Sequence, residues 1–166
     1  MVGGTLPDMT SWQEFSEQAP ELAAKVRARF FGAGKSHVLA TLRRDGSPRV
    51  SGSEIDFRGQ EVYVGSMLDA VKARDLQRDG RFAIHALPGI EEGGDAKLAG
   101  VAVEIADPAA VLGHADPSHL FRLDLREAAL TWVDEDTLFV ESWREGRGTV
   151  RFARPGNGPA VRVGDG

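Results

Sequence analysis

Short segments in which apolar and polar residues alternate recur along the 166 residues of this chain, and each predicts a β-strand. Asp45 and Gly46 are a typical hairpin turn, and residues 58–59 and 134–136 predict two more turns. Many short strands joined by tight turns predict a mainly β protein, an antiparallel barrel with a few flanking helices. The predicted strands are residues 37–42, 48–57, 61–65, 81–86, 98–106, 119–125, 129–133 and 137–143.

A second pattern, with apolar residues three or four positions apart, predicts the helices. Ser11 and Glu14 have the spacing of a capping box that opens a short helix. A longer helix is expected to begin at Pro20 and to end near residue 32, and another at residues 70–78, with Asp69 as its N-cap. Residues 107–113 predict a further helical turn.

The helix and strand pattern predicts one main domain. Residues 1–19 are expected to form a leader and a short helix, and residues 20–154 the barrel domain. Residues 87–95 are rich in glycine and acidic residues and predict a loop. The glycine- and proline-rich residues 155–166 are expected to be a disordered tail.

Composition narrows the functional classes. The net charge of −5 argues against a general nucleic-acid-binding protein. The chain has no cysteine, which excludes disulfides and thiolate metal ligands, and its four scattered histidines predict no metal site. No apolar stretch reaches the roughly 20 residues that a membrane-spanning helix needs, and no secretory signal is visible, so we expect a cytoplasmic protein.

Three side chains around the helix at residues 70–78 suggest a phosphate site. Lys72 lies in the first turn of this helix, where free N–H groups favour an anion. Ser66 follows the preceding strand and offers a hydroxyl, and Arg49 lies on a neighbouring strand with a guanidinium suited to phosphate oxygens. The alternative is a solvated lysine that pairs locally with Asp69 or Asp75.

Small residues interrupt the second strand at positions 50–53. Val50, Ser51, Gly52 and Ser53 leave room for a flat ring against the backbone, whose N–H groups can bond a polar ring edge. A strand weakened by a glycine bulge explains the same residues equally well.

Several segments, taken in order, resemble the flavin-binding split-barrel family, which includes pyridoxamine 5′-phosphate oxidase. LATL at 39–42 and DGSPRVS at 45–51 are similar to the first hairpin of the family. VGS at 64–66 and KARDLQRDGRFAIH at 72–85 are similar to its strand, phosphate helix and next strand, and FVESWREGRG at 139–148 continues the order. The resemblance covers about residues 20–152 and implies a six- to eight-stranded antiparallel split β-barrel.

The resemblance also implies a cofactor and its contacts. It implies a flavin-dependent oxidoreductase that acts on a small-molecule redox substrate, with FMN as the expected cofactor and the deazaflavin coenzyme F-420 as the alternative. It further implies a homodimer with a cofactor at each interface. Arg49, Ser66 and Lys72 match the family's phosphate contacts, Val50, Ser51 and Ser53 the strand beside the ring, and Trp143 and Arg147 a segment that reaches the partner's cofactor.

Some positions depart from the family pattern. Glu54 stands where pyridoxamine 5′-phosphate oxidase has a phosphate-binding lysine, and Val71 stands where it has an arginine. The Arg-x-His pair expected after Trp143 is missing. The chain is therefore not expected to be a pyridoxamine oxidase, and no catalytic side chain is assigned. A non-catalytic protein that binds or sequesters the cofactor, or a barrel whose site has decayed, remains an alternative, and the fold also has haem-binding members.

Overall fold

The computed structural model describes residues 10–32, 34–86 and 93–164 of the chain. The expected leader at residues 1–9 and most of the expected loop at residues 87–95 lie outside this part. No helix in the described part is long and apolar enough to span a membrane.

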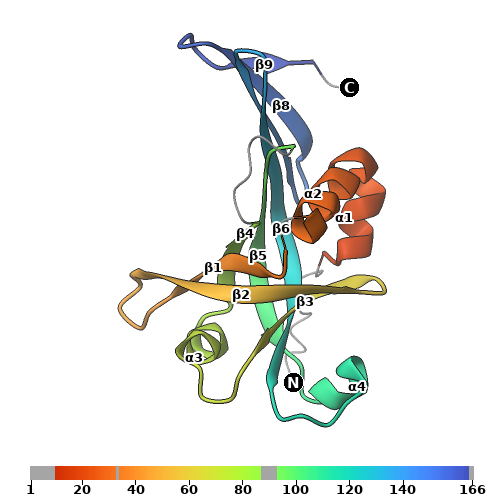
Figure 1. Cartoon of the computed structure of the whole chain (residues 1–166), viewed down its shortest axis with the longest axis vertical. Helices are drawn as coiled ribbons and strands as arrows, with labels where there is room; N and C mark the ends of the chain where they lie inside the picture. Colours follow the sequence, from red (N-terminus) through yellow and green to blue (C-terminus); the bar gives the residue numbers. More distant parts are fainter. Residues whose placement is uncertain (1–9, 33, 87–92, 165–166) are drawn as a thin grey trace, which may run out of the picture.

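Six antiparallel strands close into a barrel, as the alternating pattern predicted (Figure 1). Their order in the sheet is β3-β2-β1-β4-β5-β6, and β3 pairs with β6 to close it. Three more strands, β7, β8 and β9, extend the sheet beyond β6. The strands are β1 Ser36–Leu42, β2 Pro48–Arg58, β3 Glu61–Ser66, β4 Arg81–His85, β5 Asp95–Glu104, β6 His119–Asp134, β7 Thr137–Arg144, β8 Gly148–Pro155 and β9 Val161–Val163.

The described part of the chain contains four helices, which flank the sheet. The helices α1 (Trp12–Gln18) and α2 (Pro20–Gly32) lie together on one side of it, whereas α3 (Val71–Arg78) and α4 (Pro108–Leu112) lie at the other end of the barrel (Figure 1). The predicted capping box is present, because Ser11 and Glu14 bond each other's backbone N–H groups. Asp107 caps α4 by accepting a hydrogen bond from the Ala110 N–H.

The hydrophobic core lies between α1, α2 and the sheet. Phe15 and Phe30 of the two helices are almost completely buried, as are Leu39 of β1 and Phe121 of β6. Every second residue of β1 faces this core, which is the arrangement that period-two alternation predicts. The helices therefore cover one face of the sheet, and we call the opposite face of β2, β1, β4, β5 and β6 the open face.

The structure differs from the sequence prediction at the end of the chain. The segments 119–125 and 129–133 form one strand, β6, and β8 was not predicted at all. Part of the expected disordered tail is ordered, since β9 pairs with β8 between Val163 and Arg151 and between Val161 and Ala153. The residues Val161 and Val163 alternate with Arg162, and this short alternation is enough to add an edge strand.

A glycine in β5 allows two strands to approach closely. The register between β5 and β6 shifts between Ala99 and Gly100, which marks a β-bulge. A Cβ at Gly100 would lie 1.8 Å from the carbonyl oxygen of Asp124 on β6. Only glycine fits there, so this position serves the packing of the barrel.

Candidate functional site

A groove of about 1000 Å³ opens between β2, β3 and the start of α3. It holds three of the predicted site residues, namely Ser53, Ser66 and Lys72. Apolar residues from the end of α2, β2, α4 and the start of β6 form another part of its wall, where they are interspersed with Lys35, Glu54, Asp56 and Arg58. The apolar residues of this wall are Phe30, Phe31, Ile55, Phe57, Leu112 and Leu120.

The start of α3 has no side-chain cap. Ala70 occupies the N-cap position and makes no side-chain hydrogen bond there, so the prediction of Asp69 as N-cap was wrong. Asp69 instead has a positive φ of 60°, a left-handed conformation that turns the chain into the helix. An N-terminus without a cap leaves N–H groups and the positive end of the helix dipole available for an anion.

Lys72 lies in this first turn and carries a charge that no described carboxylate pairs with. Its Nζ donates hydrogen bonds to the Gly52 carbonyl (2.8 Å) and to Ser53 Oγ (3.3 Å), both of which are neutral. Burial lowers the pKa of Lys72, and the charge of Glu54, which forms no ion pair with it, acts in the opposite direction. The groove therefore contains a partly desolvated cation without a counter-ion, the environment that an anionic ligand would complete.

The neighbouring hydroxyls and glycines leave backbone open to a ligand. Ser66 is buried at the end of β3, and its Oγ meets only its neighbour's carbonyl, at the limiting distance of 3.4 Å. Gly52 and Gly65 both line the groove, and a Cβ at either would meet no atom within 4 Å. These two glycines are not needed for close packing of the chain, and their backbone is accessible to a flat molecule.

His37 is a groove residue that the sequence analysis did not single out. It pairs in register with Ser53 across β1 and β2, so the two side chains share the inner face. His37 is only 2% exposed, and its Nδ1 has no hydrogen-bond partner among the described residues. Burial lowers the pKa of His37, which favours the neutral ring. The ring packs edge-on against Phe30, with centroids 5.0 Å apart. The signal in the sequence was its place in the inward-facing alternation of β1.

Arg49 lies beside the groove and does not line it. Its Nε donates a 2.7 Å hydrogen bond to Oδ2 of Asp75 on α3, and Arg78 donates to Oδ1 of the same carboxylate. The alternative that Asp75 pairs with Lys72 is therefore wrong. Arg49 and Lys72 nevertheless lie along the same contact between α3 and β2, which we call the seam. Asp75 of α3 contacts Arg49 of β2, and Lys72, one turn earlier on α3, contacts positions 52–53 of β2.

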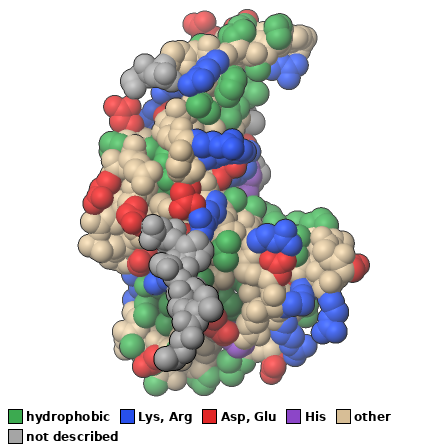
Figure 2. Space-filling model, turned by 180° about the vertical axis from the view of Figure 1, so that it is seen from behind, with side chains coloured by type: hydrophobic (Ala, Val, Ile, Leu, Met, Phe, Trp, Pro, Cys, Tyr) green, Lys and Arg blue, Asp and Glu red, His purple; other side chains and the backbone are tan. Residues whose placement is uncertain are grey.

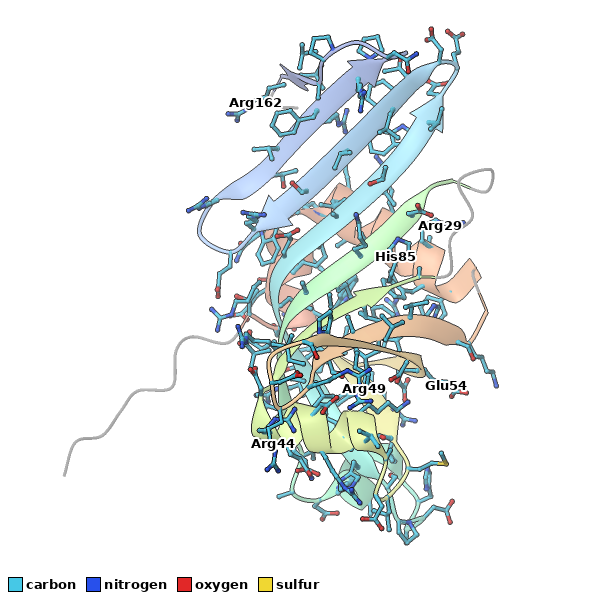
Figure 3. The ribbon with its side chains drawn as sticks, turned by 90° about the vertical axis from the view of Figure 1, so that its left-hand side faces the viewer. Arg29, Arg44, Arg49, Glu54, His85 and Arg162 are labelled. Atoms are coloured by element: carbon cyan, nitrogen blue, oxygen red, sulfur yellow. The ribbon has the colours of Figure 1, made fainter. Side chains whose placement is uncertain are left out.

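The remaining residues of the predicted strand segment divide between the two faces of β2. Val50 is 69% exposed and pairs in register with Ala40 of β1, so both lie on the open face. Ser51 pairs with the buried Leu39 and is half-buried. Figure 3 faces this side of the molecule and shows Arg49 next to α3 and Glu54 farther along β2.

The structure corrects the expected role of Trp143. Its side chain is fully buried under α1, where the ring packs 4.9 Å from Phe15 and Nε1 donates to Gln18 Oε1 (3.1 Å). Trp143 is therefore a core residue and no cofactor contact, because its neighbours on α1 and β7 enclose it. Arg147 is exposed in the β7–β8 turn, away from the groove, and its contact with a partner's cofactor stays a prediction.

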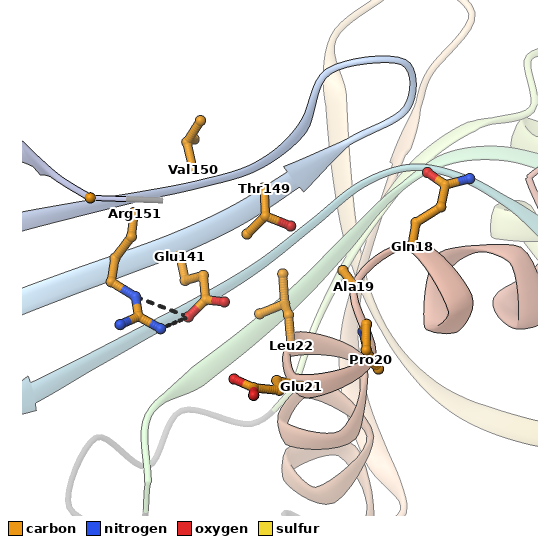
Figure 4. Close-up of a pocket in the computed structure, with 10 residues that line it drawn as sticks. Gln18, Ala19, Pro20, Glu21, Leu22, Glu141, Thr149, Val150 and Arg151 are labelled. Carbon is orange, nitrogen blue, oxygen red and sulfur yellow. Dashed lines mark hydrogen bonds and ion pairs between the residues drawn. The ribbon is translucent and has the colours of Figure 1, made fainter. Parts of the chain in front are cut away.

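A second cavity, of about 360 Å³, lies where α1 meets α2 against β7 and β8 (Figure 4). Glu141 points into it and is almost completely buried, and Arg151 donates two hydrogen bonds to its Oε2, at 3.2 and 2.7 Å. The charge of Glu141 is thus satisfied within the chain. Glu21 is the other charged residue of its described lining, so this cavity lacks the unpaired cation that distinguishes the groove.

The comparisons with known proteins concern the fold. No family model matches the sequence, and no curated protein matches it significantly. Among solved structures, PhzG of Burkholderia lata 383, solved with tetrahydrophenazine-1-carboxylic acid, is 17% identical with a TM-score of 0.60, and the match covers 98% of both chains. A candidate pyridoxamine 5′-phosphate oxidase of Listeria innocua is 13% identical with a TM-score of 0.54, covering 64% of this chain and 95% of that one.

Other matches show that the fold serves different purposes. A haem-binding protein of Mycobacterium smegmatis is 15% identical with a TM-score of 0.50, and the match covers 82% of this chain and 89% of that one. The chain spans 55% of the length of an Agrobacterium tumefaciens protein of unknown function, with a TM-score of 0.51 and 18% identity over 63% of this chain. At sequence identities this low, the matches show a similarity of fold and not of activity. The chain has the split-barrel fold of the proteins similar to pyridoxamine 5′-phosphate oxidase.

Proposed function

We propose that the groove binds FMN and that the protein is an FMN-dependent oxidoreductase acting on a small-molecule redox substrate. The observation that carries this proposal is Lys72, a partly desolvated ammonium without a described counter-ion at the uncapped start of α3. A phosphate there would receive the lysine charge and the free N–H groups of the helix.

The other groove residues fit the rest of the cofactor. The hydroxyls of Ser53 and Ser66 are buried beside Lys72 and offer donors to the phosphate and the ribityl chain. Gly52 and Gly65 leave the backbone bare where a flat ring would lie. When bound, FMN supplies hydride and electron transfer, so the chain's own residues need to bind the phosphate, orient the ring and exclude water.

The position of Glu54 next to Lys72 is an argument for FMN over the deazaflavin coenzyme F-420. Glu54 lines the groove close enough to Lys72 to act on its pKa, and it would repel the acidic tail that extends from the deazaflavin's phosphate. Asp56 is neutralised by its ion pair with Arg58, and Lys35 also lines the groove. Arg43 and Arg44 belong to the β1–β2 turn and do not line the groove, so they do not offset the charge of Glu54 there. FMN ends at its phosphate and avoids this repulsion.

The open face of the sheet supports a second copy of the chain as partner. Val38, Ala40, Ala83 and Ala99 form a shallow apolar surface there, and Val50 extends it toward the groove. The molecular outline is notched on this side, between the β1–β2 hairpin and the outer strands (Figure 2). A homodimer on this face would cover these residues and enclose the ring. Ala40→Glu, which places a charge within this surface, should give monomers in size-exclusion chromatography.

A second function on the same groove is cofactor storage without turnover. Lys72, Ser53 and Ser66 account for binding, and none of them is suited to proton transfer at a flavin ring. The haem-binding relative shows that this fold also serves binding. The buried, neutral His37 makes haem the second cofactor to test.

A cofactor panel tests the proposal. Purified protein is titrated separately with FMN, the deazaflavin and haem, and binding is followed by cofactor fluorescence or absorbance. We expect saturable binding of FMN in preference to the other two, and faster reoxidation of reduced FMN with an electron acceptor than in free solution. Preferential binding of haem would contradict the proposal, and FMN binding without any acceleration would support storage.

A further inference from the structure

The network around Asp75 bears on how the proposed FMN site is organised. Asp75 is 2% exposed in the middle of α3. Its Oδ2 accepts hydrogen bonds from Thr41 Oγ1 (2.9 Å) and Arg49 Nε (2.7 Å), and its Oδ1 accepts one from Arg78 (2.9 Å). Burial raises the pKa of this carboxyl, but the hydrogen bonds from Arg49, Arg78 and Thr41 outweigh burial and hold it below its usual range. Asp75 is therefore an anion that fixes its donors.

The bond to Asp75 uses only one edge of the Arg49 guanidinium. Nε faces the carboxylate, and the two terminal nitrogens form no hydrogen bond with the part of the chain that the structure describes. The Arg49 side chain is 23% exposed, so these nitrogens are within reach of solvent and of a ligand. A guanidinium held by Nε in this way keeps the planar fork that suits two phosphate oxygens.

The same helix orders both cations of the seam. Lys72 and Asp75 lie three residues apart, on one face of α3, and each contacts β2. The orientation of Lys72 does not depend on Asp75, because its Nζ donates hydrogen bonds to the Gly52 carbonyl and to Ser53 Oγ. The Arg49 side chain makes no other hydrogen bond with the described residues, so the orientation of its guanidinium depends on Asp75.

We propose that Asp75 is a positioning residue that orients the Arg49 guanidinium toward the phosphate of the bound cofactor. This inference rests on the proposed function, because it requires a phosphate in the seam. It makes an unusual electrostatic prediction. Removal of a negative charge near a phosphate site should strengthen anion binding by Coulomb's law alone, whereas loss of the positioning contact should weaken it.

Asp75→Asn separates the two effects, with FMN and riboflavin as paired probes. Riboflavin has the same ring without the phosphate, so it reports damage to the ring site. We expect Asp75→Asn to lower the affinity for FMN by about tenfold, the loss of one charge-assisted hydrogen bond, and to leave riboflavin affinity unchanged. Asp79→Asn is the matched control, because Asp79 ends the same helix, bonds Arg81 and lies away from the seam.

A double-mutant cycle tests whether Asp75 acts through Arg49. In an Arg49→Ala background, Asp75→Asn should weaken FMN binding no further. Asp75→Glu is a second test in case the asparagine variant does not fold. It keeps the negative charge but displaces the carboxylate, and it should also lower the affinity for FMN without lowering that for riboflavin. Unchanged or tighter FMN binding in both variants, or equal losses of FMN and riboflavin, would overturn the inference. If the wild-type protein binds no FMN, the proposed function itself fails.

Discussion

The helix-packed core around Trp143 and the groove differ in how their polar groups are paired. On the helix-covered side, the fully buried Trp143 has a hydrogen-bond partner in Gln18 and an aromatic neighbour in Phe15. In the groove, Lys72 has neutral hydrogen-bond partners but no described counter-ion, and Nδ1 of His37 has no partner among the described residues. The other buried side-chain atom without a partner in the described part of the chain is Gln13 Oε1 on α1. Buried polar groups without partners cost stability, and they persist in proteins chiefly where they serve a function. The difference teaches that the contacts around Trp143 maintain the fold, whereas the Lys72 charge in the groove is open to a ligand.

The largest expected effect is on the covered side. Trp143→Ala removes a fully buried indole and should lower the free energy of unfolding by about 3–5 kcal/mol. Chemical denaturation measures this loss. Material that remains folded should bind FMN with unchanged affinity, because the indole does not line the groove. A selective loss of FMN affinity with normal stability would restore Trp143 as a cofactor contact.

A pair of strand glycines sharpens the comparison. Gly100→Ala places a Cβ 1.8 Å from a backbone oxygen of β6 and should cost roughly 2 kcal/mol or more of stability. Gly52→Ala faces open space in the groove, so its unfolding free energy should change by less than about 0.5 kcal/mol. Thermal denaturation compares the two. Equal destabilisation would show that Gly52 serves packing as Gly100 does.

A larger side chain at position 52 tests whether the ligand occupies the space beside Gly52. Gly52→Val fills the space in which we place the flavin ring, and it should abolish most FMN binding without unfolding the protein. Fluorescence titration measures the affinity, and circular dichroism confirms the fold. Ser47→Val, in the β1–β2 turn and outside the groove, is the control, and it should bind FMN normally.

The smallest expected effect is a pH dependence at alkaline pH. Burial lowers the pKa of Lys72 below 10.5, and phosphate binding requires the protonated form. FMN affinity should therefore be retained at neutral pH and should begin to fall at a pH below 10.5. Lys72→Arg stays protonated throughout this range and should remove the decline. A wild-type affinity that is constant through this range would show that the Lys72 charge is not used.

Much of the barrel could be predicted from the sequence, because one-residue alternation reports the inner and outer faces of a strand directly. The prediction failed in β6, which was divided into two segments. There the register jumps from Glu127 opposite Ala99 to Leu125 opposite Gly100, and the extra residue, Arg126, interrupts the alternation. Ser66 and Lys72, which the order of strand, turn and helix predicted as one phosphate site with Arg49, both line the groove, whereas Arg49 lies beside it.

The rest of the site depends on contacts that no local pattern contains. Asp75 contacts Arg49 because α3 packs on β2 in one particular register, whereas the sequence suggested a local pair between Asp75 and Lys72 on the same helix. The burial of Trp143 depends on α1 folding over β7, although the two segments are more than a hundred residues apart. Long-range packing decides such contacts, and propensity does not.

The central claim is that the charge of Lys72 is kept for a phosphate. The most direct measurement is isothermal titration of FMN into the wild-type protein and into Lys72→Ala at neutral pH. The account predicts saturable binding to the wild type and an affinity at least about tenfold lower in the variant, with both proteins equally folded. Equal affinities for the two proteins, or no binding to the wild type, would contradict it.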